Sequence, residues 1–346
     1  METGPPSLAD GTETDIKVMS VLAAPKAAGL SLWAMLARRL ALGLVLLWAV
    51  SLVIFAGTQI LPGDVASAML GQQATPEAVA SIRQELGLEQ PAAVRYVKWL
   101  GGAVTGDFGR SYSNRQDIAK SIAPRLKNTL LLAAMAAVIA VPLSIGLGIL
   151  SALHAGSWID RTIGLVTLAA VSLPEFFAGY LLIAYFSVTH FWLPSSAAVS
   201  DSMSLGQRLV VMLLPCLTLV LAVVGHMMRM TRVALLNVMA SPYIETALLK
   251  GLPRSRIVWK HALPNAVSPI VNVVALNIAY LVVGVVVVEV IFVYPGMGQY
   301  LVDHVAKRDV PVVQAAGLVF AAIYIVLNIV ADMISVIANP RLRHPR

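Results

Sequence analysis

The sequence has few charged residues and a single cysteine. Asp, Glu, Lys and Arg together make up 12% of its 346 residues, and hydrophobic residues make up 58%. A soluble domain has roughly 25% charged and 45–50% apolar residues, so this composition excludes an ordinary soluble protein and indicates one that lies in lipid. Cys216 alone cannot form a disulfide framework or a multi-cysteine metal site, and we expect it to be a small buried residue.

Motifs of several enzyme classes are also missing. The sequence contains no Gly-Lys-Ser or Gly-Lys-Thr, and hence no P-loop that would bind ATP. His-Glu-x-x-His and Gly-x-Ser-x-Gly do not occur, and the six histidines are scattered along the chain. We therefore expect this chain to hold no catalytic residue, no metal and no cofactor of its own.

Long apolar segments dominate what is present. A membrane-spanning helix needs about 20 mostly apolar residues, and six segments satisfy that length. The first begins near Leu40 and is too long for the apolar region of a signal peptide, so we expect a retained anchor. The sequence thus predicts an all-α membrane protein with six transmembrane helices: Leu40–Leu61, Thr129–Leu153, Ile163–Val188, Leu209–Met228, Ala266–Val293 and Val312–Ile337.

The basic residues are distributed unevenly. The net charge is +7, and a basic balance can indicate nucleic-acid binding. Because no basic stripe lies beside aromatic residues in a polar domain, we expect no nucleic-acid partner. Apart from the long loop 62–128, Lys and Arg concentrate before the first span, between the fourth and fifth spans and after the sixth. The positive-inside rule assigns such segments to the cytoplasm. The eight Lys and Arg of the loop 62–128 do not count against this orientation, because loops beyond about 60 residues largely escape the rule. Both termini are therefore predicted to be cytoplasmic.

The segments between the spans complete the predicted organisation. The first 30 residues are rich in Pro, Gly, Ala, Ser and Thr without periodicity, which is typical of disorder. We expect a mostly disordered cytoplasmic tail over 1–39, the first span over 40–61, a periplasmic loop region over 62–128, a core with the other five spans over 129–337 and a cytoplasmic C-terminus over 338–346.

Two short helices are expected within 62–128. Thr75–Glu77 suits a helix start, with Thr at the cap, Pro at the first helical position and an acid in the first turn, and Gly87 would end that helix. A second helix begins after Pro91. One face of it is apolar and either packs on the protein or the membrane surface, or docks a soluble partner: Val94, Val97 and Leu100.

The most informative segment lies between the fourth and fifth spans. Roughly 35 residues intervene there, although helix–helix connections usually take about 2–8 residues. Ser241 and Pro242 suit the start of a short helix, and Gly251 can adopt the positive φ that ends it. Pro264 is incompatible with an ordinary helix interior. We expect two short helices that meet at Gly251, either as a basic hairpin on anionic lipid or as a docking element for a cytoplasmic partner.

The spacing of this segment resembles the signature of importer permeases of the ATP-binding-cassette (ABC) type. That signature reads Glu-Ala-Ala, three residues, Gly, nine residues, Ile, one residue and Leu-Pro. Here Thr246 replaces the first Ala, and His261 replaces Ile, as is usual in the peptide-transporting branch. By this resemblance the segment, at about 229–264, is a coupling loop that inserts into a groove of the ATPase subunit through Glu245, Thr246, Ala247, Gly251, His261, Leu263 and Pro264.

The resemblance extends from about Arg38 to Arg341 and is closest to the B-type permease subunit of the dipeptide/oligopeptide/nickel importer family. It implies the type I ABC importer permease fold, a partly helical periplasmic loop after the first span, and the bacterial inner membrane as location. It also implies a second homologous permease, two cytoplasmic ATPase subunits or domains that bind ATP and Mg, and a periplasmic or lipid-anchored solute-binding protein. Supporting stretches are Leu61–Asp64, Leu86–Pro91, Gly106–Ser111, Ser172–Pro174 and Glu289–Gly298.

Polar residues in the predicted spans are candidates for the translocation path. Glu175 follows Pro174 directly, at a position where the family pattern has a small or apolar residue. An ionisable residue in a span marks a functional site by default, so Glu175 is a candidate. Pro174 is another, because it breaks the backbone hydrogen bonding of the third span and can kink it at a gating position, with packing accommodation as the alternative. Asn272 and Asn277 are further candidates, with hydrogen bonding between helices as the alternative. For Glu289 we expect a structural role near the outer end of the fifth span.

The predicted function is thus that of a permease subunit that moves di- or oligopeptides, or similar small organic solutes, inward by alternating access. A nickel or metal-chelate importer of the same family is an alternative, although Cys216 and His226 are the only imidazole or thiolate ligands in the spans. An ATP-independent secondary transporter would favour acid or histidine relays and helix repeats, which are not evident. A membrane-embedded enzyme would need the motifs that are missing.

Overall fold

The computed structural model describes residues 32–60, 65–200 and 202–338. Within these ranges the protein is helical, and an isolated bridge between Arg110 and Asp117 is its one β-type pairing. Expectations for the N-terminal tail before residue 32, for 61–64 and for the C-terminus after residue 338 lie outside the described residues.

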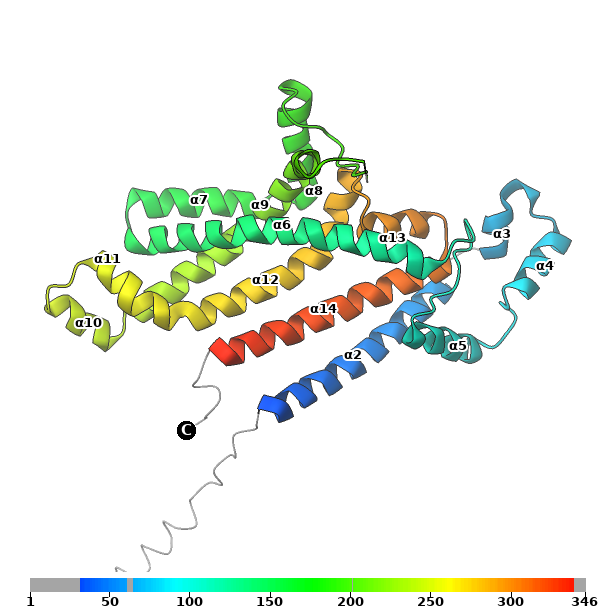
Figure 1. Ribbon diagram of the computed structural model, residues 1–346, viewed down its shortest axis with the longest axis horizontal. Helices are drawn as coiled ribbons and strands as arrows, with labels where there is room; N and C mark the ends of the chain where they lie inside the picture. Colours follow the sequence, from blue (N-terminus) through cyan, green and yellow to red (C-terminus); the bar gives the residue numbers. More distant parts are fainter. Residues whose placement is uncertain (1–31, 61–64, 201, 339–346) are drawn as a thin grey trace, which may run out of the picture.

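Five long helices lie side by side along the long axis of the molecule (Figure 1). Each begins before the span that the sequence predicts. The helix α6 begins at Ile118 rather than Thr129 because the Asp117 side chain caps it, accepting a hydrogen bond from the Lys120 N–H at 3.1 Å. The five helices are α2 (Leu32–Ile60), α6 (Ile118–Leu153), α9 (Leu205–Met239), α12 (Leu263–Ile291) and α14 (Val310–Ala338).

The third predicted span is broken, and the expectation of one helix over Ile163–Val188 is wrong. The chain forms α7 (Trp158–Ser172), then α8 (Glu175–Leu182) and a π-helical segment (Ile183–Thr189), with a bend of 102° between the two parts. Leu173 is extended, and Pro174 cannot donate a backbone hydrogen bond, so the helix ends at the predicted kink. Counting this pair as one span gives six candidate spans in the described residues.

Short helices mark the two ends of the bundle (Figure 1). We call them the α10 end, with α10 (Pro242–Leu249) and α11 (Arg254–Ile257), and the α5 end. The predicted cap of α4 is confirmed, because the Thr75 hydroxyl accepts a hydrogen bond from the Ala78 N–H at 3.2 Å. The α5 end comprises α3 (Val65–Leu70), a 3₁₀ turn (Gly71–Gln73), α4 (Pro76–Glu85), α5 (Ala92–Thr105) and α13 (Met297–Ala306).

Most of the apolar face expected for α5 does not pack on the rest of the chain. Val94 and Val97 are exposed, and Leu100 is half-buried. The packed side of α5 instead carries Tyr96 and Trp99, whose rings lie 5.3 and 6.1 Å from the ring of Phe55 in α2. Aromatic rings bury more apolar area than valine side chains do, and they decide which side of α5 faces the bundle.

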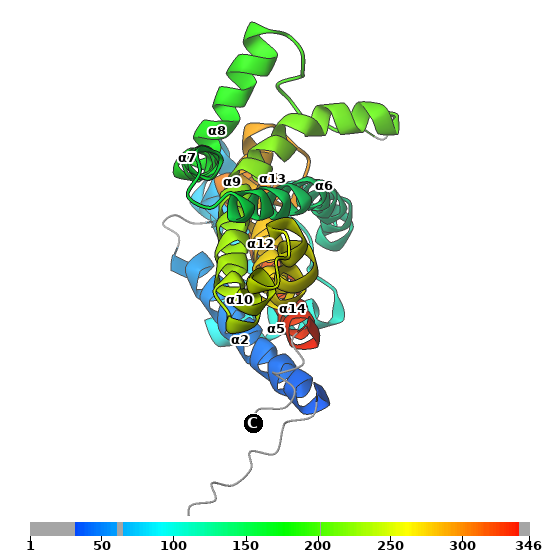
Figure 2. The same cartoon turned by 90° about the vertical axis from the view of Figure 1, so that its left-hand side faces the viewer.

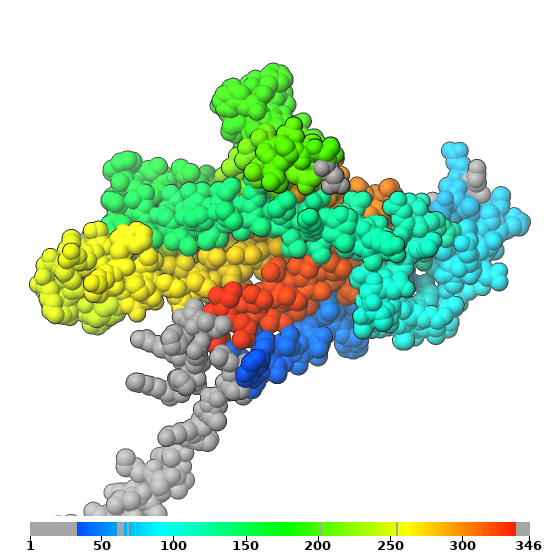
Figure 3. Space-filling model, in the orientation of Figure 1, coloured from blue at the N-terminus to red at the C-terminus, as the bar shows by residue number. Residues whose placement is uncertain are grey.

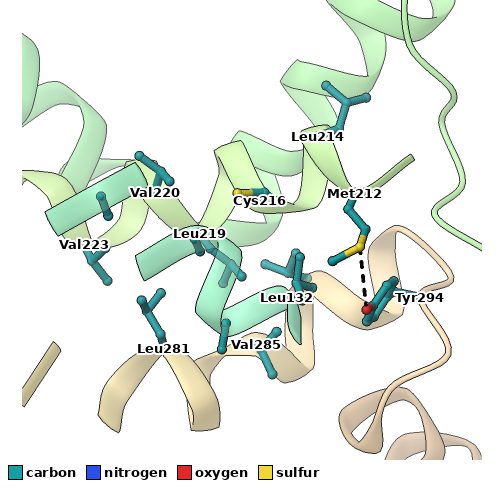
Figure 4. Packing of buried hydrophobic residues seen from close by; sticks show 14 of the residues in the cluster. Leu132, Met212, Leu214, Cys216, Leu219, Val220, Val223, Leu281, Val285 and Tyr294 are labelled. Atoms are coloured by element: carbon teal, nitrogen blue, oxygen red, sulfur yellow. Dashed lines mark hydrogen bonds between the residues drawn. The ribbon is translucent and has the colours of Figure 1, made fainter. Parts of the chain in front are cut away.

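The main core lies where α6, α9 and α12 meet. Figure 4 shows Leu132 of α6, Leu219 of α9 and Val285 of α12 in one buried cluster, and Cys216 is buried in it as expected. A second apolar cluster closes the α10 end, and a third joins α6, α13 and α14 at the α5 end. The helix α2 packs on the outside of α14, tied by an ion pair between Arg39 and Asp332 and, at its other end, by a hydrogen bond from Gln314 to Thr58 at 2.7 Å.

One part of the chain packs against the main core along one side, through Leu182, Ile183 and Phe186, and projects from the bundle. The helix α8 and the π-helical segment after it project from one side of the bundle, away from α2 and α14 (Figures 1 and 2). The space-filling view shows the same segment as a separate projection (Figure 3). Its large apolar side chains Phe176, Tyr180 and Tyr185 are exposed. We refer to residues 175–189 as the arm.

Candidate functional site

The connection between α9 and α12 forms the α10 end (Figure 2). As predicted, α10 begins with Pro242 directly after Ser241. Ser241 occupies the cap position, but its hydroxyl donates to the Val238 carbonyl and makes no cap hydrogen bond to α10. The start of α10 is therefore set by the fixed φ of Pro242 and the extended backbone of Ser241.

The end of α10 depends on Gly251. Its φ is +75°, a conformation that glycine adopts at little cost. The Gly251 N–H donates to the Leu248 carbonyl at 2.9 Å, and the Leu252 N–H donates to the Ala247 carbonyl at 3.3 Å. These two bonds are the Schellman arrangement, which pairs the last carbonyls of a helix. The predicted meeting of two short helices at Gly251 is confirmed.

The expected break at Pro264 is wrong, because α11 continues into α12. A π-helical segment, Val258–Ala262, joins them into one continuous helix from Ser255 to Ile291. The Leu263 N–H bonds to the Val258 carbonyl five residues back. This wider turn accommodates Pro264, which has no N–H to offer and lies in the first turn of α12.

The inner face of this connection is fastened to the bundle. Ile244 of α10 and Ile257 of α11 are fully buried, and they pack with Leu235 of α9. Ala247, the third residue of the Glu-Thr-Ala triplet, belongs to the same buried cluster. Burial of this apolar area holds α10 and α11 against the ends of α6, α9 and α12.

The outer face of α10 is exposed. Glu245 and Thr246 face solvent, and so do three large apolar side chains, of which Leu249 is 84% exposed. Of the other predicted residues, His261 and Leu263 are half-buried and Pro264 is exposed. The helix therefore presents one acid and an apolar surface beyond the bundle, with Tyr243, Leu248 and Leu249 as its large apolar members.

A partly buried ion pair that the sequence analysis missed lies next to this element. Arg232 of α9 donates two hydrogen bonds to the Asp160 carboxylate of α7, at 2.8 and 2.7 Å. The Ser151 hydroxyl and the Gly156 N–H donate to the same carboxylate. The pair ties the α6–α7 turn to α9. Its signal in the sequence is Ser157, which caps α7 three residues before the acid.

The broken span brings together two of the candidate path residues. Glu175 lies in the first turn of α8, directly after Pro174. The Tyr280 hydroxyl of α12 donates to Glu175 Oε1 at 2.8 Å. Tyr280 was not predicted, because nothing in the local sequence links position 280 to position 175. The carboxylate and the phenol meet at the root of the arm, where it leaves the bundle.

The two asparagines do not join this corner. Asn272 Oδ1 accepts a hydrogen bond from the Ser335 hydroxyl of α14 at 2.9 Å, as expected for bonding between helices. Asn277 donates to the Val273 carbonyl of its own helix at 2.8 Å. The four candidate path residues therefore do not form one site. Pro174 and Glu175 lie at the root of the arm, and the two asparagines of α12 form their hydrogen bonds elsewhere.

At the α5 end, Glu289 has the structural environment that was expected. Its buried carboxylate accepts hydrogen bonds from the Thr129 hydroxyl at 2.6 Å and from the Gly298 and Gln299 N–H groups at 2.7 and 3.2 Å. It thus binds the first turn of α13 to α6 and α12, where a negative charge is favoured at a helix N-terminus. A Cβ at Gly296 would lie 2.1 Å from Glu289 Oε1, so only glycine fits there.

A second buried carboxylate, Asp309, holds the loop before α6. It accepts hydrogen bonds from the Ser111 hydroxyl at 2.5 Å and from the Tyr112 and Ser113 N–H groups at 3.0 and 3.1 Å. Burial, and then the Asp309 charge, raise the pKa of Tyr112. A cavity of about 900 Å³ lies beside this loop and is lined by α2, α5, the 107–112 loop and the start of α14.

No group of three or more His, Cys, Asp or Glu side chains that could hold a metal ion occurs in the described part of the chain. His226 and Cys216, the two possible ligands in the spans, belong to no such group. The polar residues described above contact one another through ion pairs and hydrogen bonds. The described residues thus form a helical membrane protein with an exposed helix, α10, at one end and a polar corner at the root of the arm.

Comparisons with known proteins agree with this architecture. Residues 144–344 match the family of binding-protein-dependent transport system inner membrane components, and residues 32–133 match the N-terminal domain of such membrane components. The chain therefore belongs to this family of ABC transporter permeases, as the coupling-loop pattern predicted. Permeases are membrane subunits without a catalytic site, and the candidate spans agree with a multi-pass membrane protein.

Individual relatives cover nearly the whole chain. The glutathione transport system permease protein GsiC of Escherichia coli strain K12 is 38% identical over 304 residues, which are 88% of this chain and 97% of GsiC. A probable peptide ABC transporter permease, y4tP of Sinorhizobium fredii, is 31% identical over 307 residues, 89% of this chain and 98% of y4tP. A solved structure of the methionine ABC transporter MetNI in inward facing conformations covers 63% of this chain and 96% of its own, at 19% identity and a TM-score of 0.47.

Proposed function

We propose that this chain is one of two homologous permease subunits of an ABC importer that moves di- or oligopeptides, or similar small organic solutes, into the cell by alternating access. Family membership supports transport across the membrane. The relatives are named for peptide and glutathione transport, which supports this class of solute. The observation that carries the coupling role is α10, a helix fastened by its inner face and exposed on its outer face.

The exposed face of α10 is the surface on which we place the ATPase. The docking role that the resemblance implies agrees with the exposure of Glu245 and Thr246 on α10 and of Gly251 in the turn after it. Exposed apolar side chains such as Leu249 would be covered by a partner, which gives the contact its free energy. The ATPase, not this chain, binds ATP and Mg, since this chain has no P-loop.

This assignment orients the molecule. The α10 end is cytoplasmic, because basic residues gather there as the positive-inside rule requires. The α5 end is then periplasmic, and the solute-binding protein delivers its solute to that end. The start of α2 and the end of α14 lie on the side of the α10 end (Figure 1), so the proposed orientation makes both of them cytoplasmic. The basic residues of the α10 end include Arg161, Arg229, Lys250, Arg256 and Lys260.

The path of coupling follows from the covalent structure of the connection. The helix α10 is joined to α9 through one residue pair, Ala240 and Ser241. On its other side, the turn at Gly251 leads into the continuous helix from Ser255 to Ile291. A displacement of α10 by a closing ATPase dimer is therefore passed to α9 and α12 as a rigid-body motion. These two helices and α6 share the main core, so the motion reaches the centre of the bundle.

Two variants test the coupling role. Glu245→Lys reverses the exposed charge, and Gly251→Pro removes the N–H that bonds to Leu248 and forbids the positive φ. We expect both to insert into the membrane but to separate ATP hydrolysis from transport in the reconstituted complex. The matched control is Glu77→Lys, which reverses an exposed acid in the first turn of α4, a helix that also begins with proline. Normal transport by both α10 variants would refute the docking role.

The solute class is tested separately. Uptake of labelled di- and tripeptides and of free Ni²⁺ is compared in cells with and without this gene. We expect peptide uptake to depend on the gene, because the described residues offer no cluster of metal ligands. Loss of Ni²⁺ uptake alone, with peptide uptake intact, would assign the chain to metal import.

A further inference from the structure

The corner between the arm and α12 has an unusual composition for a membrane protein. Glu175 is half-buried, and Tyr280, its hydrogen-bond partner, is 51% exposed in this chain although it lies in the middle of α12. Among the described residues, no Lys, Arg or His forms an ion pair with Glu175. A carboxylate in a span therefore has a phenol and no cation beside it.

Lipid cannot be the environment of this corner. A charged side chain in hydrocarbon is costly, and ionisable residues in spans face a protein interior or a water-filled path and mark solute routes. Glu175 lies at the 102° bend, at the root of the arm, and it is half-buried, so the chain itself covers the carboxylate only in part. The exposed apolar side chains of the arm, such as Phe176 and Tyr180, are of the kind that a second permease would cover. The corner then lies at the boundary between two subunits, where a path between them runs.

We infer that Glu175 and Tyr280 form a recognition point for the ammonium group of the solute inside the translocation path. The inference rests on the proposed function. Tyr280 donates its hydroxyl proton to Oε1 of Glu175, which leaves Oε2 free to accept from a cation. A phenol oxygen that donates its proton still has lone pairs, so Tyr280 can supply a second acceptor.

The affinity of this recognition point for an ammonium group suits a transporter. One carboxylate and one phenol make a charge-assisted contact with an ammonium group, but they do not form a complete cage of acceptors. A carrier must release what it binds, so a partial site favours passage over retention. The bend also places Glu175 in the first turn of α8, directly after Pro174. At this position the carboxylate has no cation of its own among the described residues.

Charge-changing variants of the complete complex test the inference. The complex, with its partner subunits and binding protein, is reconstituted in vesicles, and import of labelled trialanine is measured. Glu175→Gln should lower import about ten-fold, the loss expected for one charge-assisted hydrogen bond. Glu175→Asp should stay within about three-fold of the unmodified complex, and Glu175→Lys should import less than Glu175→Gln because it repels the ammonium group. Tyr280→Phe should lower import about three-fold, since the carboxylate is kept but loses its orientation.

Two further readouts separate recognition from a structural role. The amount of partner permease that copurifies, and the thermal stability of the complex, should be unchanged in Glu175→Gln. Equal import by Glu175→Gln and the unmodified complex would overturn the inference, and so would equal import by the Gln and Lys variants. Loss of the partner permease from the Glu175→Gln complex would also overturn it, because Glu175 would then pair with a cation of that subunit. If the unmodified complex imports no peptide, the proposed function fails before the variants are compared.

Discussion

The two ends of the molecule are held together by different interactions. At the α5 end, two buried carboxylates, Glu289 and Asp309, each accept hydrogen bonds from one hydroxyl and two backbone N–H groups of other segments. At the α10 end, α10 and α11 are held by an apolar cluster around Ile244 and Ile257. The polar anchor nearest to them, Asp160 with Arg232, binds α7 to α9 and does not touch α10.

This difference has a mechanical consequence. Hydrogen bonds to a buried carboxylate are directional and leave costly unpaired groups when they break, so they fix one arrangement. Apolar contacts are non-directional, and a helix held by them can shift as a unit against its neighbours. The α5 end is therefore built as the fixed part of the chain and the α10 end as the part that can move, which agrees with docking of an ATPase on α10.

The largest effect is expected when the Glu289 anchor is removed. Glu289→Leu leaves one hydroxyl and two N–H groups in a buried site without an acceptor. Each buried polar group left without a partner costs about 1–3 kcal/mol, so we expect the purified protein to lose most of its folded fraction. Thermal unfolding of the detergent-solubilised complex measures this. Glu289→Gln keeps one acceptor oxygen, so its thermal stability should lie between those of Glu289→Leu and the unmodified protein. Equal stability of Glu289→Leu and the unmodified protein would contradict the role of Glu289 as an anchor.

Removal of the Asp309 anchor should have a smaller and more local effect. Asp309→Ala frees the Ser111 hydroxyl and the Tyr112 and Ser113 N–H groups, and water from the adjacent cavity can reach part of this loop. We expect a loss of about 3 kcal/mol, less than the sum of three buried unpaired groups at about 1–3 kcal/mol each. Hydrogen exchange should rise in 109–117 and not in α10. A rise at both ends would show that the two regions are not independent.

At the α10 end, one pair of substitutions separates stability from coupling. Ile244→Ala opens a space in the buried cluster and should cost about 2–3 kcal/mol, at the lower part of the range for such truncations, because α10 can settle inward. Leu249→Ala removes a side chain that is 84% exposed and should leave stability within about 0.5 kcal/mol. If α10 docks the ATPase, Leu249→Ala should nevertheless reduce ATPase copurification. Unchanged copurification with Leu249→Ala, together with a loss with Ile244→Ala, would mean that α10 acts only through its packing.

Much of the fold could be predicted because it depends on local signals. Apolar run length located the long helices, and the Thr75 cap and the Gly251 turn follow from residue types at fixed positions. The helix α6 begins earlier than expected because its first turns, around Lys120 and Arg125, are polar and extend the helix beyond the apolar run. The bend at Pro174 was foreseen as a kink, but its 102° angle depends on what the arm packs against, which a single sequence does not contain.

The candidate site was predictable only where it is continuous in sequence. The pattern from Glu245 to Pro264 lies on one segment, so its spacing can be recognised directly. The partners of Glu175 and Asp160 are 105 and 72 residues away, and such pairings arise from helix packing. The π-helical turn before Pro264 was missed for a related reason. A proline in a long apolar run predicts a break, whereas packing of Val258 and Ala262 in the buried cluster keeps the helix continuous.

The smallest effect is expected at the cap of α4, which lies at the α5 end but outside its buried anchors. Thr75→Ala removes the acceptor for the Ala78 N–H and should cost about 1 kcal/mol, the usual value for a lost N-cap. The helix α4 has no buried residue, so the loss should stay local and leave the melting temperature of the complex nearly unchanged. Hydrogen exchange at 77–79 should quicken about five-fold, since 1 kcal/mol corresponds to roughly that factor. Thr75→Ser keeps the hydroxyl and should exchange at the original rate. A fall in overall stability with Thr75→Ala would mean that α4 is part of the fixed end, and the boundary of that end would move outward to include it.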